Sequence, residues 1–73
     1  MKRYIVNVHR RKLDDEGLPY WLNSTETHRA DSWQSAILSH SRVGAEFESL
    51  IDEEDLDQRC EKFGYLIHWE FAK

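Results

Sequence analysis

Alternation of apolar and polar positions predicts a strand at each end of the chain. Tyr4, Val6 and Val8 occupy every second position, which is the period of a half-buried strand over residues 2–12. The C-terminal run has the same period, and its apolar positions are Tyr65, Ile67, Trp69 and Phe71. We therefore expect both terminal segments to lie in a sheet with one face on a core.

A turn follows the first strand. Residues 14–19 combine three acids with Gly17, which tolerates a positive φ, and with Pro19, which rigidifies the chain. The chain resumes at Tyr20 and runs through a Thr- and Ser-rich stretch to about Arg29. This pattern predicts a hairpin whose second strand covers residues 20–29.

Helical spacing begins after the hairpin, and either Asp31 or Ser32 starts the helix. With Asp31 as the N-cap, Gln34 falls at the capping-box position. The apolar face of this helix then holds Trp33, Ala36, Ile37 and His40. We expect His40 at the edge of the core, and we expect Val43–Gly44 to end or interrupt the helix.

A second helix is predicted after Asp52, which is a suitable N-cap. Leu56, Cys60 and Phe63 form one apolar edge, acids crowd the first turn, and Gly64 is suited to end the helix. Between the two helices, residues 46–51 fit a helical turn or a short strand equally well.

The element order is therefore β-β-α-α-β in one α+β domain spanning residues 1–73. A right-handed crossover places the last strand beside the first, which predicts an antiparallel three-stranded sheet of order 2-1-3 with helices on one face. Such a sheet has two free edges, so a homodimer remains open.

Length and cysteine usage narrow the picture. With 73 residues the core is thin, and the single Cys60 excludes an internal disulfide, which fits a reducing cytoplasm. No apolar run approaches the ~20 residues of a membrane-spanning helix, and the N-terminus lacks a signal-peptide pattern. We therefore expect a cytoplasmic protein.

Charge is distributed unevenly under a net charge of −4. The first thirteen residues contain five basic residues and no acid, whereas residues 44–61 contain eight acids and only Arg59. The two regions either pair with each other inside the fold or present surfaces of opposite sign to partners.

Catalytic and metal-binding patterns are weak. Four histidines and Cys60 show none of the spacings of zinc sites, and His9 and His68 are expected together on the outer face of the sheet. Neighbouring residues on a helix point about 100° apart, so Ser39-His40-Ser41 does not make a dyad, and Cys60 belongs to the core. We expect neither an enzyme nor a metal or other cofactor.

Two binding hypotheses remain. The first is a protein-interaction module, a small regulator or inhibitor in the style of phage and mobile-element accessory proteins, with an acidic helical face that binds a partner bearing a basic surface. The residues assigned to that face are Glu46, Glu48, Asp52, Glu53, Glu54, Asp55 and Asp57, with Trp21 as an aromatic anchor. A solvated helix whose first-turn acids only stabilise its dipole is the plainer alternative.

The second hypothesis is nucleic-acid binding by the basic hairpin. By alternation, Arg3, Ile5, Asn7, His9 and Arg11 share one face, which Thr25, Thr27 and Arg29 join from the second strand. The residues assigned to this interface are Arg3, His9, Arg10, Arg11, Lys12 and Arg29. A sequence pI near 5.5 opposes nonspecific phosphate binding.

Overall fold

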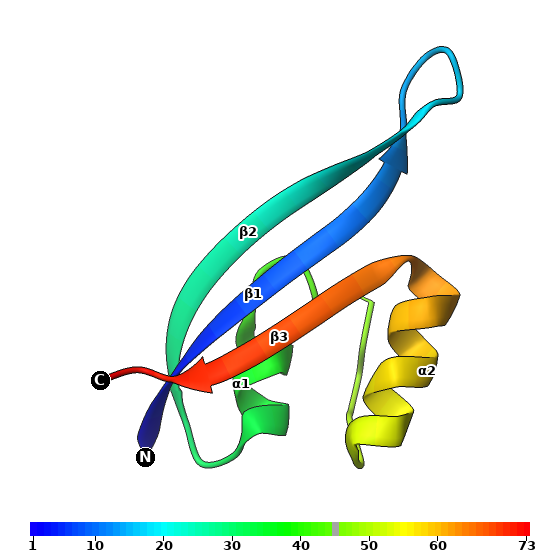
Figure 1. Ribbon diagram of the computed structural model, residues 1–73. Coiled ribbons are helices and arrows are strands. Elements are labelled where there is room, and N and C mark those ends of the chain that lie inside the picture. The colour runs from blue at the N-terminus through cyan, green and yellow to red at the C-terminus, as the bar shows by residue number, and fades with distance from the viewer. Residues whose placement is uncertain (45) are drawn as a thin grey trace.

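A computed structural model describes residues 1–44 and 46–73 of the chain. Its elements are β1 (Lys2–Leu13), β2 (Pro19–Ala30), α1 (Trp33–Ser39), α2 (Glu53–Phe63) and β3 (Tyr65–Phe71). They form one antiparallel sheet of order β2-β1-β3 with both helices on the same face (Figure 1). The α+β class and the strand order predicted from the sequence are confirmed.

The central strand β1 pairs with both neighbours, but over different lengths. Its pairing with β2 runs from Lys2↔Ala30 to Leu13↔Pro19, whereas its pairing with β3 stops at Arg10↔Tyr65. The end of the β1–β2 hairpin therefore extends beyond the third strand (Figure 1), in a molecule 44 Å long. At the tip, the Asp14 carboxylate accepts the backbone N–H of Leu18, which closes the turn.

Alternation along β1 sends Tyr4, Val6 and Val8 into the core beneath the sheet, where each is buried. The helices and the chain between them cover this face with apolar side chains. The fully buried residues contributed from that side are Ala36, Ile37, His40, Val43 and Phe47.

Helix α1 starts at Ser32, one of the two predicted positions, but it ends earlier than predicted. The Ser32 hydroxyl accepts the backbone N–H of Ser35, so the alternative start, a capping box of Asp31 with Gln34, is wrong. Gln34 instead donates to the carbonyl of Ile51 across the helical layer. The helix ends at Ser39, several residues before Gly44, and a turn follows.

Helix α2 begins and ends as predicted. Asp52 accepts the backbone N–H of Asp55 at 2.8 Å, and Gly64 closes the helix with a φ of 74°. The segment 46–51 is neither the helical turn nor the strand that the sequence allowed. It is irregular chain that buries Phe47 against the rings of Phe63 and Tyr65, so tertiary packing rather than local periodicity holds it.

Candidate interaction surfaces

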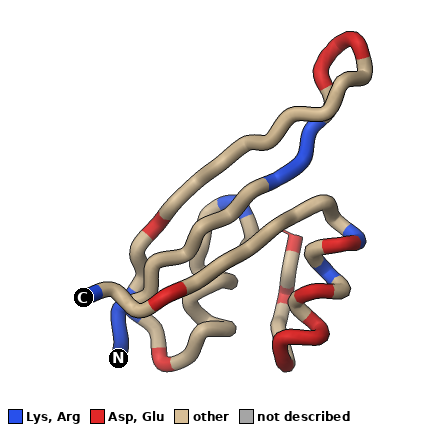
Figure 2. The backbone as a smooth tube through the Cα atoms, viewed as in Figure 1, with Lys and Arg blue, Asp and Glu red and all other residues tan. Residues whose placement is uncertain are grey.

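Acidic residues gather on α2 and on the segment before it (Figure 2), and most of them are exposed. Leu56 and Cys60 turn one side of α2 into the core, which leaves its charged side facing solvent. We call the exposed carboxylates of this region the acidic surface; its members are Glu48, Asp52, Glu53, Glu54, Asp57 and Glu61. Among the described residues, none of the six forms an ion pair.

Two acids assigned to the same face are engaged within the protein. Glu46 pairs with Arg10 of β1, and Arg10 also donates to the Tyr65 hydroxyl at 3.0 Å. Asp55 pairs with Arg59 at 3.0 Å. The hydrogen bond from Arg59, followed by that from the Ile51 backbone, lowers the pKa of Asp55. Both carboxylates therefore contribute to internal contacts.

The aromatic anchor assigned to this face lies elsewhere. Trp21 is 50 % exposed, but it belongs to β2 at one edge of the sheet, whereas α2 packs on β3 at the opposite edge. The apolar side chain next to the acidic surface is Ile51, which is 74 % exposed and precedes Asp52. The sequence left residues 46–51 as either a helical turn or a strand, so no periodicity predicted that Ile51 would be exposed.

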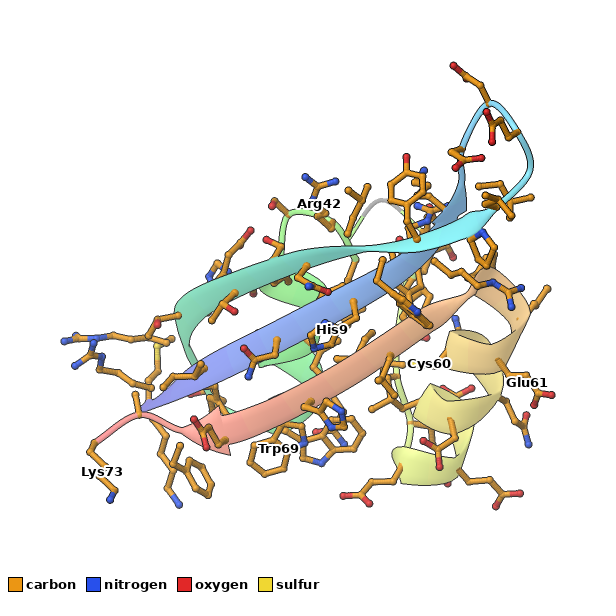
Figure 3. All side chains as sticks on the ribbon, turned by 45° about the horizontal axis from the view of Figure 1, so that its top comes forward. His9, Arg42, Cys60, Glu61, Trp69 and Lys73 are labelled. Carbon is orange, nitrogen blue, oxygen red and sulfur yellow. The ribbon has the colours of Figure 1, made fainter. Side chains whose placement is uncertain are left out.

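Both helices lie on one face of the sheet, and within residues 1–44 and 46–73 no helix covers the opposite face, which we call the open sheet face (Figure 3). Its residues are Arg3, Ile5, Asn7, His9 and Arg11 on β1, Trp21, Asn23, Thr25, Thr27 and Arg29 on β2, and Leu66, His68 and Glu70 on β3. Glu70 is its only carboxylate among the described residues. The sequence placed Arg3, His9, Arg11 and Arg29 on one face, and the structure brings them together there.

Arg3 and Arg29 stand directly opposite each other in the β1–β2 register. Like charges at such a position repel and destabilise the strand pair, and no ion pair involves either residue in the described part of the chain. An anion placed between the two guanidinium groups would relieve this repulsion.

Arg10 and Lys12 lie on the opposite side of the sheet from the four residues above. With Ser41, Arg42 and Glu46 they line an open hollow of about 400 Å³. Arg10 is paired with Glu46 there. The six basic residues assigned to one interface therefore divide between the two faces of the sheet.

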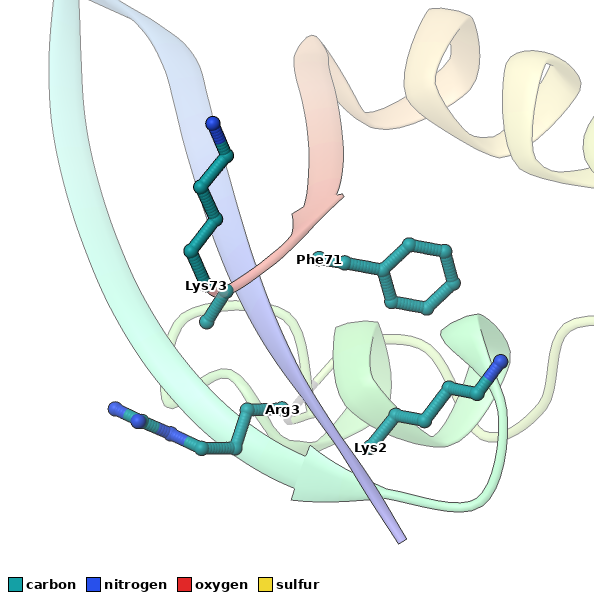
Figure 4. Close-up of a pocket in the computed structure, with 5 residues that line it drawn as sticks. Lys2, Arg3, Phe71 and Lys73 are labelled. Atoms are coloured by element: carbon teal, nitrogen blue, oxygen red, sulfur yellow. The ribbon is translucent and has the colours of Figure 1, made fainter.

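A second open hollow, of about 360 Å³, lies where the two chain ends meet (Figure 4). Lys2 sits over the Phe71 ring with its Nζ 5.0 Å from the ring centroid. Figure 4 shows the Lys2 and Arg3 side chains leaving β1 in opposite directions, because neighbouring residues of a strand face opposite ways. The cations around this hollow therefore do not converge on one point.

A polar cluster under β2 is the feature that sequence reasoning missed. Glu26 accepts hydrogen bonds from the hydroxyl and backbone N–H of Ser41, and its Oε1 lies 2.7 Å from Nε2 of His28. The Ser41 hydroxyl and then His28 hold the pKa of Glu26 at about 2, while burial lowers the pKa of His40 beside it. Residues 26 and 41 belong to separate segments, so no local pattern could reveal this contact.

The predicted placements of His9, His68 and Cys60 are found in the structure. His9 and His68 lie on the open sheet face with ring centroids 6.2 Å apart, and no group of three potential metal ligands occurs among residues 1–44 and 46–73. The Ser39 hydroxyl donates to the Ser35 carbonyl rather than to His40. Burial raises the pKa of the Cys60 thiol, which disfavours a reactive thiolate.

No protein family, curated protein or solved structure matches the chain. Within the described ranges, neither helix is long and apolar enough to cross a membrane.

Proposed function

We propose that this protein is a protein-binding module, a small regulator or inhibitor that docks its acidic surface on a basic surface of a partner protein. One observation carries the proposal: six exposed carboxylates gather on α2 and its preceding segment without ion pairs among the described residues. In the part of the chain that the structure describes, no arginine of β1 pairs with any of the six, and the ion pair of Arg10 is with Glu46.

The chemistry of this surface suits association with a cationic partner. Unpaired carboxylates concentrated on one side steer a basic partner toward them and raise the association rate. Ile51 adds an exposed apolar side chain at the start of α2, where contact with a partner would remove it from water. A basic groove that otherwise holds nucleic acid is one surface of this kind, and blocking it would inhibit its owner. Such a module would act in the cytoplasm.

A charge-neutralising variant tests the proposal without unfolding the helix. Glu48→Gln, Asp57→Asn and Glu61→Gln remove three charges while leaving the Asp52 cap and the Asp55–Arg59 pair intact. The control variant carries Asp15→Asn, Glu16→Gln and Glu70→Gln, which changes the net charge equally at exposed positions away from α2.

Proteins captured from an extract of the source cells by the wild-type chain and by each variant would be compared first. A specific partner should be retained by the wild type and the control but lost by the α2 variant. With that partner purified, we expect affinity at low salt to fall about tenfold or more in the α2 variant, with a shallower salt dependence. Equal effects of both variants would refute a specific acidic docking surface.

A second candidate, binding of single-stranded nucleic acid on the open sheet face, is favoured by the unpaired Arg3–Arg29 juxtaposition and by exposed Trp21 opposite Arg11. Guanidinium groups bind phosphates, and an exposed indole offers a stacking surface for a base. The pI near 5.5 and the acidic surface oppose this function, so it ranks second.

Titration of a fluorescent single-stranded oligonucleotide at two salt concentrations tests the second candidate. Arg3→Gln with Arg29→Gln should abolish binding and its steep loss with salt, whereas Lys12→Gln with Arg42→Gln, on the helix-covered side, should leave both unchanged. Absence of binding by the wild type at low salt would eliminate this candidate.

A further inference from the structure

The strand β2 forms a long edge of the sheet with little of the usual protection. Its twelve residues pair with β1 one to one, so residues 2–30 contain no bulge in this ladder. Natural edge strands are blunted by lysines, prolines or bulges, because unpaired backbone groups recruit other strands. β2 contains no lysine, and its only proline is Pro19 at its start. Its two charged side chains of other kinds are Arg29 near its end and Glu26, which is bound to Ser41 and His28 on the helix-covered side.

The phase of the ladder identifies which backbone groups point outward. Asp14 donates its N–H to the Leu18 carbonyl, so 14 and 18 are a hydrogen-bonded pair and even-numbered residues of β2 face β1. The odd-numbered residues therefore direct their N–H and C=O groups to the free edge. These residues are Trp21, Asn23, Thr25, Thr27 and Arg29, and all of them are exposed.

The other edge of the sheet is partly covered. α2 packs against β3, and Cys60 of that helix is buried beside it. The free edge of β2 is thus the more accessible edge for adding a strand.

We propose that the free edge of β2 pairs antiparallel with the β2 of a second copy of this chain, about a two-fold axis at Thr25. The odd-numbered residues of β2, whose backbone N–H and C=O groups point to the free edge, must lie opposite odd-numbered residues of the partner strand. The two-fold axis must therefore pass through a residue and not between two residues. Axes at Ser24 and Thr25 give the longest overlap of strands that span Pro19–Ala30.

Side-chain complementarity selects between these registers. An axis at Ser24 sets Pro19, which has no N–H to donate, opposite the partner's Arg29. An axis at Thr25 sets the Ser24 hydroxyl opposite the partner's Glu26 carboxylate. It also sets the Trp21 ring opposite the partner's Arg29, a cation–π pair that offsets the repulsion of Arg29 by Arg3. A shift of the axis to Glu26 would oppose two carboxylates, so Thr25 is favoured.

The symmetry has a consequence for the acidic surface. An axis perpendicular to the sheet joins the two β2 strands at the centre and leaves β3 and α2 of each copy at the outer ends. A six-stranded dimer would therefore present two acidic surfaces facing away from each other. The proposal rests on the β2 edge alone and does not depend on what those surfaces bind.

A cysteine placed at the axis tests the register. Residues paired across a hydrogen-bonded site have Cα atoms about 5.5 Å apart, which suits a disulfide, so Thr25→Cys should form an intermolecular crosslink on mild oxidation. The matched control is Thr27→Cys, because two copies of residue 27 would lie about 13 Å apart along the strands and should not crosslink. Crosslinking of Thr27→Cys and not of Thr25→Cys would overturn the register.

Sedimentation over about a hundredfold range of protein concentration tests the dimer itself. The wild type and Thr25→Val should dimerise, whereas Thr25→Lys should remain monomeric, because two lysines would meet on the axis. Circular dichroism of Thr25→Lys checks that the chain still folds. A monomeric wild type at every concentration, or a dimer indifferent to Thr25→Lys, would refute the proposal.

Discussion

The environment of His40 differs most from what the sequence predicted for a single residue. The sequence placed it at the edge of the core, but its side chain is fully buried. Its Nδ1 accepts the Arg42 backbone N–H at 3.1 Å, and its Nε2 lies 3.7 Å from the Glu26 carboxylate. Burial is the larger influence and lowers the pKa of His40, while Glu26 opposes that change in pKa.

This environment predicts a pH-dependent stability. Because the folded state holds the pKa of His40 below 6.5, the unfolded chain binds a proton at this site first as the pH falls. The free energy of unfolding should therefore decrease as the pH falls below 6.5. The stabilisation that comes from ionised Glu26 is lost only at lower pH, between pH 4.5 and about 2.

Urea unfolding at several pH values between neutrality and the upper limit of the Glu26 range would measure this dependence. The non-titrating variant His40→Asn should be less stable at neutral pH but should show a smaller decrease on acidification. His28 and Arg42 also lie near His40, so the difference between wild type and variant is the informative quantity. An identical pH slope in both proteins would contradict the assignment to His40.

At the scale of elements, α2 shows how local chemistry sets boundaries. Asp52 supplies the N-terminal cap, acids occupy the first turn and Lys62 the last, in agreement with the helix dipole. Gly64 ends the helix in the left-handed conformation and leads directly into β3. The tight helix-to-strand connection therefore depends on one glycine.

Gly64→Ala should destabilise the protein by about 1 kcal/mol. A Cβ at this position would meet the Arg11 Cβ at 3.9 Å, which is ordinary contact, so the cost comes from the positive φ alone. Thermal unfolding would measure it. Gly64→Asn should cost less, because Asn tolerates the left-handed region better than Ala; equal losses for both variants would indicate a steric cause instead.

At the scale of the whole molecule, the irregular segment 46–51 is as important to the core as the helices are. Phe47 is 2 % exposed, and its ring packs 5.5 Å from those of both Phe63 and Tyr65, which come from α2 and β3. Arg10 of β1 forms an ion pair with Glu46, the residue before Phe47. One segment without regular structure thus ties three elements together.

Phe47→Ala should cost about 3–5 kcal/mol, which approaches the whole stability of a small domain. We expect a largely unfolded chain or one with a strongly lowered melting temperature, as measured by circular dichroism. Phe71→Ala is the control, because Phe71 is 51 % exposed at the end of β3 and should cost much less. A stable Phe47→Ala variant would show that the segment contributes little to the core.

The sequence alone determined the elements whose signals are local. Period-two alternation predicted β1 and β3, the turn residues predicted the hairpin, and Asp52 with Gly64 predicted the bounds of α2. These signals depend on neighbours within a few residues, and the crossover rule then gave the strand order. Side-chain alternation likewise placed Arg3, His9 and Arg11 together on the face that no helix covers.

Only the tertiary structure decided the contacts between distant segments. Glu46 and Arg10 are 36 residues apart in the chain, and no spacing rule indicates that this pair forms while the six carboxylates of the acidic surface stay exposed. The burial of His40, the contact of Ser41 with Glu26 and the separation of Trp21 from α2 have the same origin. Periodicity specifies which way a side chain points from its own element, whereas its partner depends on how the elements pack.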